Sequence, residues 1–184
     1  MTHKHLMIAI DWAGPYRSIA DANKAAADDF DHGLYMCLGR CGLERKVRPQ
    51  YIGIATSLSA RVKHDHPALC HVAGDFALWL GEITTAEPSG KRMKVTKPTL
   101  DYAEWLHARF MDLPLNDRKK KSLPPRSVTV LNRWLKTDYE TPRQRRPHAD
   151  WPDLIDFPMY ELPARAVWFG RRQRHFPAPD YVAR

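Results

Sequence analysis

Long apolar runs and a full set of paired cysteines are both missing from this sequence. No stretch of the 184 residues is apolar for the length that a membrane-spanning helix needs, and the short run at residues 6–10 ends at Asp11, too early for a signal peptide. Cysteine occurs at only three positions, Cys37, Cys41 and Cys70, and an odd, low number does not suit a disulfide framework. We therefore expect a cytoplasmic protein with reduced thiols and no membrane partner.

Acidic residues are scarce in the last third of the chain. Residues 1–117 carry 14 basic and 14 acidic side chains, whereas residues 118–184 carry 15 basic and 7 acidic ones. The net charge of +8 therefore lies entirely in the C-terminal segment, which also holds nine of the fifteen prolines. Such a surplus suits a polyanionic partner, although a solvated basic surface without a partner would have the same composition.

Alternating hydrophobicity predicts two short strands in the first half of the chain. These strands, at residues 33–38 and 51–54, flank a charged loop and are expected to form an antiparallel hairpin. Other strands are expected at residues 6–10, 76–83 and 166–169, and helices at 19–30, 56–66 and 99–113, while residues 127–134 fit either a strand or a helix.

The two hairpin segments carry tripeptides that name a nuclease superfamily. Gly-Leu-Tyr stands at residues 33–35 and Tyr-Ile-Gly at residues 51–53, where GIY-YIG nucleases carry their two motifs. Arg61 follows the second tyrosine by ten residues, Glu104 lies on a later expected helix, and Asn116 comes twelve residues after Glu104. Because five features occur in the family's order, the chain resembles the GIY-YIG nuclease superfamily.

The resemblance implies a fold and a division of the chain. The fold would be α/β (α+β), with a small three-stranded, mostly antiparallel sheet flanked by helices as the nuclease core at residues 33–117. An N-terminal strand-and-helix extension, residues 1–32, would pack on this core. A basic, proline-rich C-terminal extension, residues 118–184, would contact nucleic acid.

The resemblance also implies chemistry that these side chains can perform. Tyr35 and Tyr51 point to one face of the hairpin and can bracket a water molecule or a phosphate, with Tyr35 assigned as the general base. A phenol with a pKa near ~10 is a poor base unless cations lie close by. Arg61 offers a planar fork for phosphate oxygens. Glu104 would bind Mg²⁺ or Mn²⁺, and Asn116 would orient Glu104 or a bound water.

The expected function is therefore a divalent-metal-dependent endonuclease that hydrolyses phosphodiester bonds. DNA is the expected substrate, and restriction, defence and repair are the roles that the family suggests. The alternative from another functional class is a catalytically inactive nucleic-acid-binding module with the same fold.

The position of the family's histidine differs in this chain. Four residues after Arg61 the sequence has Asp65, which is flanked by His64 and His66. If the helix at residues 56–66 is continuous, His64 lies one turn from Arg61, so His64 is the expected catalytic histidine and His66 the alternative.

Two other groupings of metal-ligating residues are present. Cys37 and Cys41, together with Cys70-His71, provide four zinc-binding side chains, but their spacing is not that of a zinc knuckle. Glu104 and His107 are one helical turn apart, and His107 is expected on the surface or next to the glutamate.

Basic residues expected to contact nucleic acid lie in the hairpin loop, after Arg61 and in the C-terminal segment. They are Arg45, Lys46, Arg48, Lys63, Lys119, Lys120, Lys121, Arg171 and Arg172.

Overall fold

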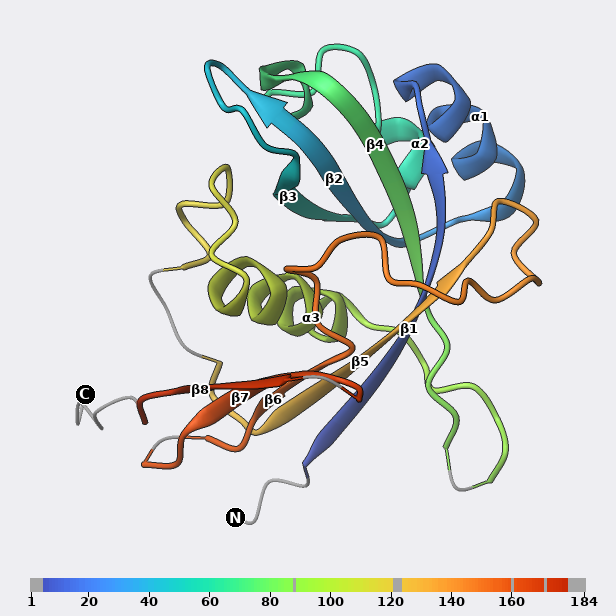
Figure 1. Cartoon of the computed structure of the whole chain (residues 1–184). Coiled ribbons are helices and arrows are strands. Elements are labelled where there is room, and N and C mark those ends of the chain that lie inside the picture. Colours follow the sequence, from blue (N-terminus) through green and yellow to red (C-terminus); the bar gives the residue numbers. More distant parts are fainter. Residues whose placement is uncertain (1–4, 88, 121–123, 160, 171, 179–184) are drawn as a thin grey trace.

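The computed structural model describes residues 5–87, 89–120, 124–159, 161–170 and 172–178, and within them eight strands form one mixed sheet (Figure 1). Their order across the sheet is β3-β2-β4-β1-β5-β6-β7-β8. The strands are β1 (Leu6–Tyr16), β2 (Gly33–Cys41), β3 (Arg48–Ala55), β4 (Val72–Ile83), β5 (Val128–Leu135), β6 (Leu154–Phe157), β7 (Ala164–Trp168) and β8 (Arg172–Phe176). The helices are α1 (Ile19–Asp29), α2 (Leu58–Arg61) and α3 (Lys97–Phe110), with a 3-10 turn at Leu69–His71.

The expectation of a small three-stranded sheet flanked by helices is wrong. Strands β3, β2 and β4 are antiparallel neighbours, but they are only part of the sheet. Strand β1 lies at its centre and pairs antiparallel with β4 and parallel with β5, from Leu6 opposite Val128 to Ala13 opposite Leu135. The first and last segments of the chain therefore join the same sheet as the middle segment.

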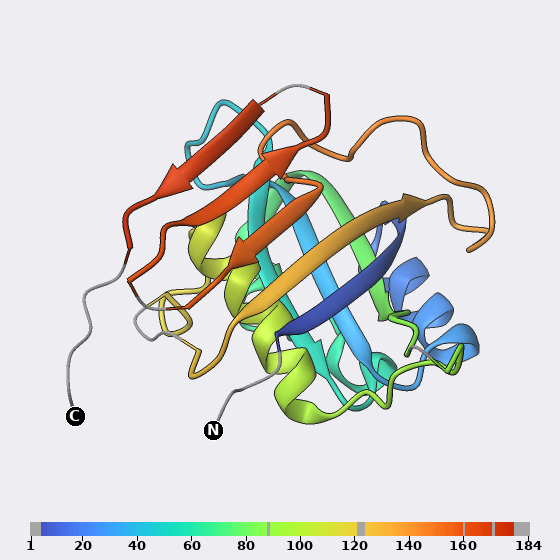
Figure 2. The same cartoon turned by 90° about the horizontal axis from the view of Figure 1, so that it is seen from below.

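The sheet curls around α3, which lies on its concave side (Figures 1 and 2). The helix begins after Thr96, whose side chain accepts a hydrogen bond from the Thr99 backbone N–H, and Pro98 in the first turn fits the fixed backbone angle of proline. Nine of its fourteen residues are buried, so the helix is surrounded by apolar groups on most of its circumference.

Strand alternation assigns side chains to two cores on opposite faces of the sheet. Leu34, Met36 and Ile52 pack in the larger core with α3, whereas Tyr35 and Cys37 pack in the smaller core with α1 and α2. The face that carries Tyr35 is therefore not the face that holds α3.

A buried polar network joins α3 to two central strands. The indole Nε1 of Trp12 on β1 donates to Asn132 Oδ1 on β5 at 2.8 Å, and Asn132 Nδ2 donates to the Pro152 carbonyl at 3.0 Å. His107 Nε2 on α3 lies 3.0 Å from the same Asn132 oxygen. His107 is fully buried, and its Nδ1 lies 2.7 Å from the Ala103 carbonyl, so the expectation that it lies on the surface is wrong and both ring nitrogens are used by partners other than Glu104.

The three cysteines differ in exposure, and none is paired with another in a disulfide. Cys37 is buried, Cys41 is partly exposed, Cys70 is exposed, and all three are free thiols. In the part of the chain that the structure describes, no three His, Cys, Asp or Glu side chains are grouped so that they could hold a metal ion. None of the helices in the same ranges is long and apolar enough to cross a membrane.

We predict that Asn132→Leu lowers the free energy of unfolding by about 3 kcal/mol. The substitution removes the side chain that pairs Trp12 with the Pro152 carbonyl and leaves both groups unsatisfied in the interior, where each costs about 1–3 kcal/mol. Urea denaturation measures the effect. Gln144→Leu, at an exposed position, is the control and should change stability by less than about 0.5 kcal/mol. Equal effects of the two substitutions would contradict a special role for Asn132.

Candidate active site

A pocket of about 630 Å³ opens beside the edge strand β3. Its walls come from β3, from α2 and the loop after it, from α3 and from the segment that follows α3. The lining includes Tyr51, Arg61, His66, Glu104, Asn116 and Lys119. The structure thus brings together residues from separate segments that the sequence had suggested for one site.

Tyr35 lies behind the pocket wall and is fully buried. Its hydroxyl is 2.8 Å from Nε2 of His66. The other ring nitrogen of His66 accepts hydrogen bonds from the backbone N–H groups of Ala68, at 3.1 Å, and Leu69, at 3.3 Å. A neutral His66 ring therefore carries its proton on Nε2 and donates it to the Tyr35 oxygen.

The glycine of the second tripeptide makes room for this phenol. A Cβ atom at Gly53 would lie 2.3 Å from both Cζ and the hydroxyl oxygen of Tyr35. Tyr35 and Gly53 are direct partners in the β2–β3 ladder, so the ring of one strand crosses the backbone of the other. Only glycine at position 53 allows Tyr35 to extend toward His66.

Arg61 lies near both tyrosines. Its positive charge acts on Tyr35 and on Tyr51, and Arg61 itself is exposed. Burial raises the pKa of Tyr35 far above its ordinary value, and the smaller opposing effect of Arg61 does not offset it. Tyr51 is partly exposed and lines the pocket, so it is the tyrosine that a substrate can reach.

His66 packs against both tyrosines, whereas His64 is exposed. The rings of Tyr35 and Tyr51 are centred 5.5 and 5.4 Å from the His66 ring. Burial, followed by the charge of Arg61, lowers the pKa of His66 below its ordinary 6.5. The structure therefore places His66, and not the expected His64, against Tyr35 and Tyr51.

A tertiary contact explains this difference. The helix expected at residues 56–66 ends at Arg61, because Asn23 on α1 donates two hydrogen bonds, to the carbonyls of Ser59 at 2.6 Å and Val62 at 2.8 Å. The Ser59 carbonyl is the one that a longer helix would pair with Lys63. Pro67 further disfavours helical backbone at the residue before it. His64 therefore lies outside the helix and not one helical turn from Arg61.

Glu104 supplies a buried carboxylate to the pocket wall. Only 6% of the residue is exposed, and its Oε2 lies 2.9 Å from the ammonium of Lys119. Burial raises the pKa of Glu104, and Lys119 opposes this effect. The same ammonium is 2.9 Å from Oδ1 of Asp101, one helical turn before Glu104. Lys119, expected to contact nucleic acid, is thus engaged with two carboxylates.

Asn116 supports the pocket through the backbone of β3. Its Oδ1 accepts from the Ile52 N–H at 2.8 Å, and its Nδ2 donates to the Ile52 carbonyl at 2.7 Å. The amide is therefore used to fasten the segment after α3 to the strand that carries Tyr51. No hydrogen bond to Glu104 accompanies these contacts among the residues that the structure describes.

The expected Mg²⁺ or Mn²⁺ does not fit the pocket as its side chains are arranged. These ions take near-octahedral sets of oxygen ligands. The two carboxylates that could contribute, Asp101 and Glu104, both contact the Lys119 ammonium at 2.9 Å. A second cation at Glu104 would lie against this positive charge, so these side chains as arranged do not form a site for a divalent metal ion.

A second cavity, of about 920 Å³, lies between the β2–β3 loop, the C-terminal end of α3, the 148–150 segment and β8. We call it the cationic groove. Five basic side chains, Arg45, Lys46, Arg48, Arg172 and Arg174, and three acidic ones, Glu44, Asp112 and Asp150, line it. Segments more than a hundred residues apart in the sequence therefore share one basic surface.

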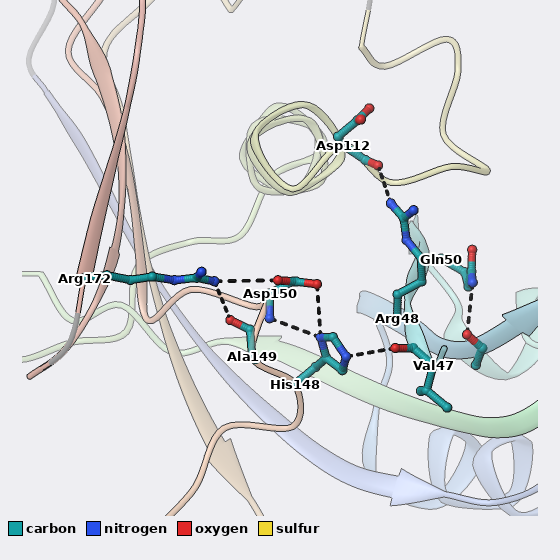
Figure 3. Close-up of polar contacts among 9 residues, drawn as sticks. Val47, Arg48, Gln50, Asp112, His148, Ala149, Asp150 and Arg172 are labelled. Carbon is teal, nitrogen blue, oxygen red and sulfur yellow. Dashed lines mark hydrogen bonds and ion pairs between the residues drawn. The ribbon is translucent and has the colours of Figure 1, made fainter. Parts of the chain in front are cut away.

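Polar contacts fix the walls of the cationic groove relative to one another (Figure 3). His148 Nε2 lies 2.9 Å from the Val47 carbonyl, and His148 Nδ1 lies 3.7 Å from the Asp150 carboxylate. Arg172 donates to the Ala149 carbonyl at 2.9 Å and pairs with Asp150 at 3.6 Å. The loop before β3 and strand β8 are thus joined through the 148–150 segment.

Among the described residues, some basic side chains of the groove already form an ion pair with an acidic side chain, and others do not. Arg45 and Lys46 are exposed and form no ion pair with any residue in the described ranges. Arg172 also stacks on Trp168, with its guanidinium 4.1 Å from the ring centre. Arg45 and Lys46 are therefore the side chains most available to an anion.

The remaining basic residues suggested by the sequence have different surroundings. Lys63 is exposed, while Lys120 pairs with Asp112 at 3.0 Å. Lys121 and Arg171 lie outside the described residues.

Comparisons of the chain with protein-family models, with curated proteins and with solved structures give no match. The resemblance to GIY-YIG nucleases therefore stays a prediction from the sequence.

We predict that the free energy of unfolding falls as the pH is lowered from about 7 to about 5, and that His66 contributes to this fall. Its pKa is lower in the folded protein, so below 6.5 the unfolded chain binds more protons and folding is increasingly disfavoured. His66→Asn keeps an oxygen that can accept from the Ala68 and Leu69 N–H groups but cannot titrate. Urea denaturation across this range should give a flatter profile for His66→Asn than for the unaltered protein.

His64→Asn is the matched control for this measurement. His64 is exposed, so its replacement should leave the profile unchanged. Parallel profiles for His66→Asn and the unaltered protein would show that His66 does not carry the effect.

Proposed function

We propose that this protein hydrolyses phosphodiester bonds of nucleic acid, with DNA as the expected substrate, in the pocket beside β3. One observation carries the proposal: Tyr51 lines the same pocket as Arg61, whose positive charge acts on it, and lies beside His66, a histidine that its burial keeps neutral at pH 7. A base with its oxygen near a guanidinium is what attack of water on a phosphodiester requires. Sequence motifs and spatial arrangement support the same chemistry independently.

Arg61 is the residue proposed to bind the scissile phosphate. Its exposed guanidinium can offer two parallel N–H donors to phosphoryl oxygens, a geometry that lysine cannot reproduce. Negative charge builds up on these oxygens as water attacks, and the fixed positive charge stabilises it.

Tyr51, rather than Tyr35, is proposed as the general base. Tyr35 is fully buried and its raised pKa keeps it protonated, so it cannot accept a proton from a water molecule in the pocket. It can donate its own proton toward the Tyr51 oxygen while it accepts one from His66. Tyr35 and Arg61 would thus face the Tyr51 oxygen with a donor and a positive charge. Tyr51 first passes its own proton to solvent and then takes a proton from the attacking water as the new P–O bond forms; the ester bond breaks, and the leaving oxygen takes a proton from solvent water.

The cationic groove is proposed to hold the same nucleic acid strand. Arg48 of the groove and Tyr51 of the pocket are three residues apart on β3, which is about 10 Å along a strand. A polyanion bound along the groove would therefore continue past the pocket.

The second candidate function is a nucleic-acid-binding module without catalysis. It is favoured by the full burial of Tyr35 and by the neutralisation of Glu104 by Lys119, which both lie in the site. A plasmid-nicking assay separates the two: binding without nicking under any condition would support the module.

We predict that Tyr51→Phe reduces single-turnover DNA cleavage by ~10² or more, the usual scale for a positioned acid–base group. Tyr35→Phe should reduce it less, because Tyr35 acts only through Tyr51. Both variants keep the aromatic ring, so circular dichroism should show normal folding. His66→Ala should reduce cleavage more than His64→Ala. Unchanged cleavage by Tyr51→Phe would remove Tyr51 from the chemistry, and a larger loss for Tyr35→Phe would reverse the two roles.

We predict that the double variant Arg45→Gln/Lys46→Gln binds duplex DNA with a weaker salt dependence. Each lost phosphate contact should lower the slope of log K against log salt by about 0.9, so two lost contacts give a change of about 1.8. Fluorescence anisotropy at several salt concentrations measures the slope.

Lys91→Gln/Lys94→Gln is the matched control for the groove. Lys91 and Lys94 are also exposed, but they precede α3, whereas the groove lies at the helix's other end. The control should leave the slope unchanged. Equal slopes for both double variants would show that the groove is not where DNA binds.

A further inference from the structure

We propose that the ammonium of Lys119 occupies the position at Glu104 where a divalent metal ion would otherwise bind. The pocket would then catalyse cleavage without a divalent metal ion. The part of this inference that concerns cleavage rests on the proposed function. The part that concerns occupancy of the cation position does not.

The ammonium of Lys119 bridges two carboxylates. It lies 2.9 Å from Glu104 Oε2 and 2.9 Å from Asp101 Oδ1, and the two acids are one turn apart on α3. Glu104 is 6% exposed, and a carboxylate removed from water to this extent needs a positive partner. The lysine supplies that partner from within the chain.

The position of Lys119 is set by the backbone around it. Its N–H donates to the Asn116 carbonyl at 3.2 Å, in a turn that directly follows the buried Leu113. The Asn116 amide makes two hydrogen bonds to the backbone of Ile52, next to Tyr51 in the sequence. The turn that carries Lys119 is thus attached to β3 by hydrogen bonds, and this attachment fixes the position of the ammonium.

A divalent ion would have to expel this ammonium to reach Glu104. Both carboxylates would have to exchange a 2.9 Å ion pair for metal ligation, and the positive charge of Arg61 also acts on Glu104. With two protein carboxylates at most, the rest of an octahedral shell would come from water and substrate. The lysine already neutralises the same acids without this rearrangement.

Lys119 also retains a donor for the substrate. An ammonium has three N–H groups, and among the described residues two of them are used, by Asp101 and Glu104. The third can donate to a phosphoryl oxygen or to the oxygen that leaves when the ester bond breaks. Arg61 and Lys119 would then provide the two positive charges that face the phosphate across the pocket.

Direct titration with Mn²⁺ tests whether Lys119 occupies the cation position. Isothermal calorimetry on the full chain should show no binding at millimolar Mn²⁺ for the unaltered protein. Lys119→Met keeps a long aliphatic side chain but frees Asp101 and Glu104, so it should bind Mn²⁺ at least ~10-fold more tightly. Lys119→Met/Glu104→Gln should lose this binding again.

Lys120→Met is the matched control. It removes the same charge from the neighbouring residue, which pairs with Asp112 rather than with the pocket acids, so it should behave as the unaltered protein. Lys119→Arg keeps a cation and should also exclude Mn²⁺, which separates loss of charge from loss of fold. Glu104-dependent Mn²⁺ binding by the unaltered protein, unchanged in Lys119→Met, would overturn the proposal.

Cleavage assays complete the test. In EDTA the unaltered protein should cut DNA, Lys119→Met should cut at least ~10²-fold more slowly, and added Mn²⁺ should restore part of the loss only in the variant. Cleavage by the unaltered protein that stops in EDTA would overturn the metal-independent role. If neither protein cuts DNA under any condition, the proposed function fails. The Mn²⁺ titration alone still decides whether the Lys119 ammonium excludes a divalent ion from Glu104.

Discussion

The packing of α3 into the concave side of the sheet is the contact on which the rest of the structure depends. Its apolar residues fill the core between strands that are far apart in the sequence, and His107 ties the helix to Asn132 at the sheet's centre. The same placement fixes the segment after the helix against β3. Glu104 and Lys119 therefore line the pocket beside β3, even though α3 and Tyr35 lie on opposite faces of the sheet.

The local pattern of the sequence predicted individual elements better than their assembly. The expected strands at residues 33–38, 51–54 and 76–83 fall within β2, β3 and β4, because period-two alternation is a local signal. The eight-stranded sheet was missed because its central parallel pairing joins Leu6 to Val128 and leaves no local trace. Strand β8 consists of Arg-Gln-Arg-His-Phe, which lacks any apolar alternation.

In the site, too, local sequence patterns suggested some residues, whereas contacts between distant segments became visible only in the folded chain. Alternation and motif spacing suggested Tyr35, Tyr51 and Arg61 together, and the structure places them near one another. The structure places His66, the alternative, rather than the preferred His64 beside the tyrosines, because Asn23, from another helix, ends α2 early. The ion pair of Lys119 with Glu104 had no sequence signal, since lysine in a basic segment reads first as a surface charge. Burial, which makes Tyr35 an unsuitable base, is likewise a tertiary property.

An open sheet has two edge strands, and each is a template on which another chain could add a strand. In this protein the outer edge of β3 is occupied at Ile52, where the Asn116 amide takes both the N–H and the carbonyl that a foreign strand would use. The opposite edge, β8, presents Arg172 and Arg174, whose like charges repel a second copy of the same strand. The residue that fastens the pocket wall to β3 therefore also blocks this edge against pairing with a strand of another copy of the chain.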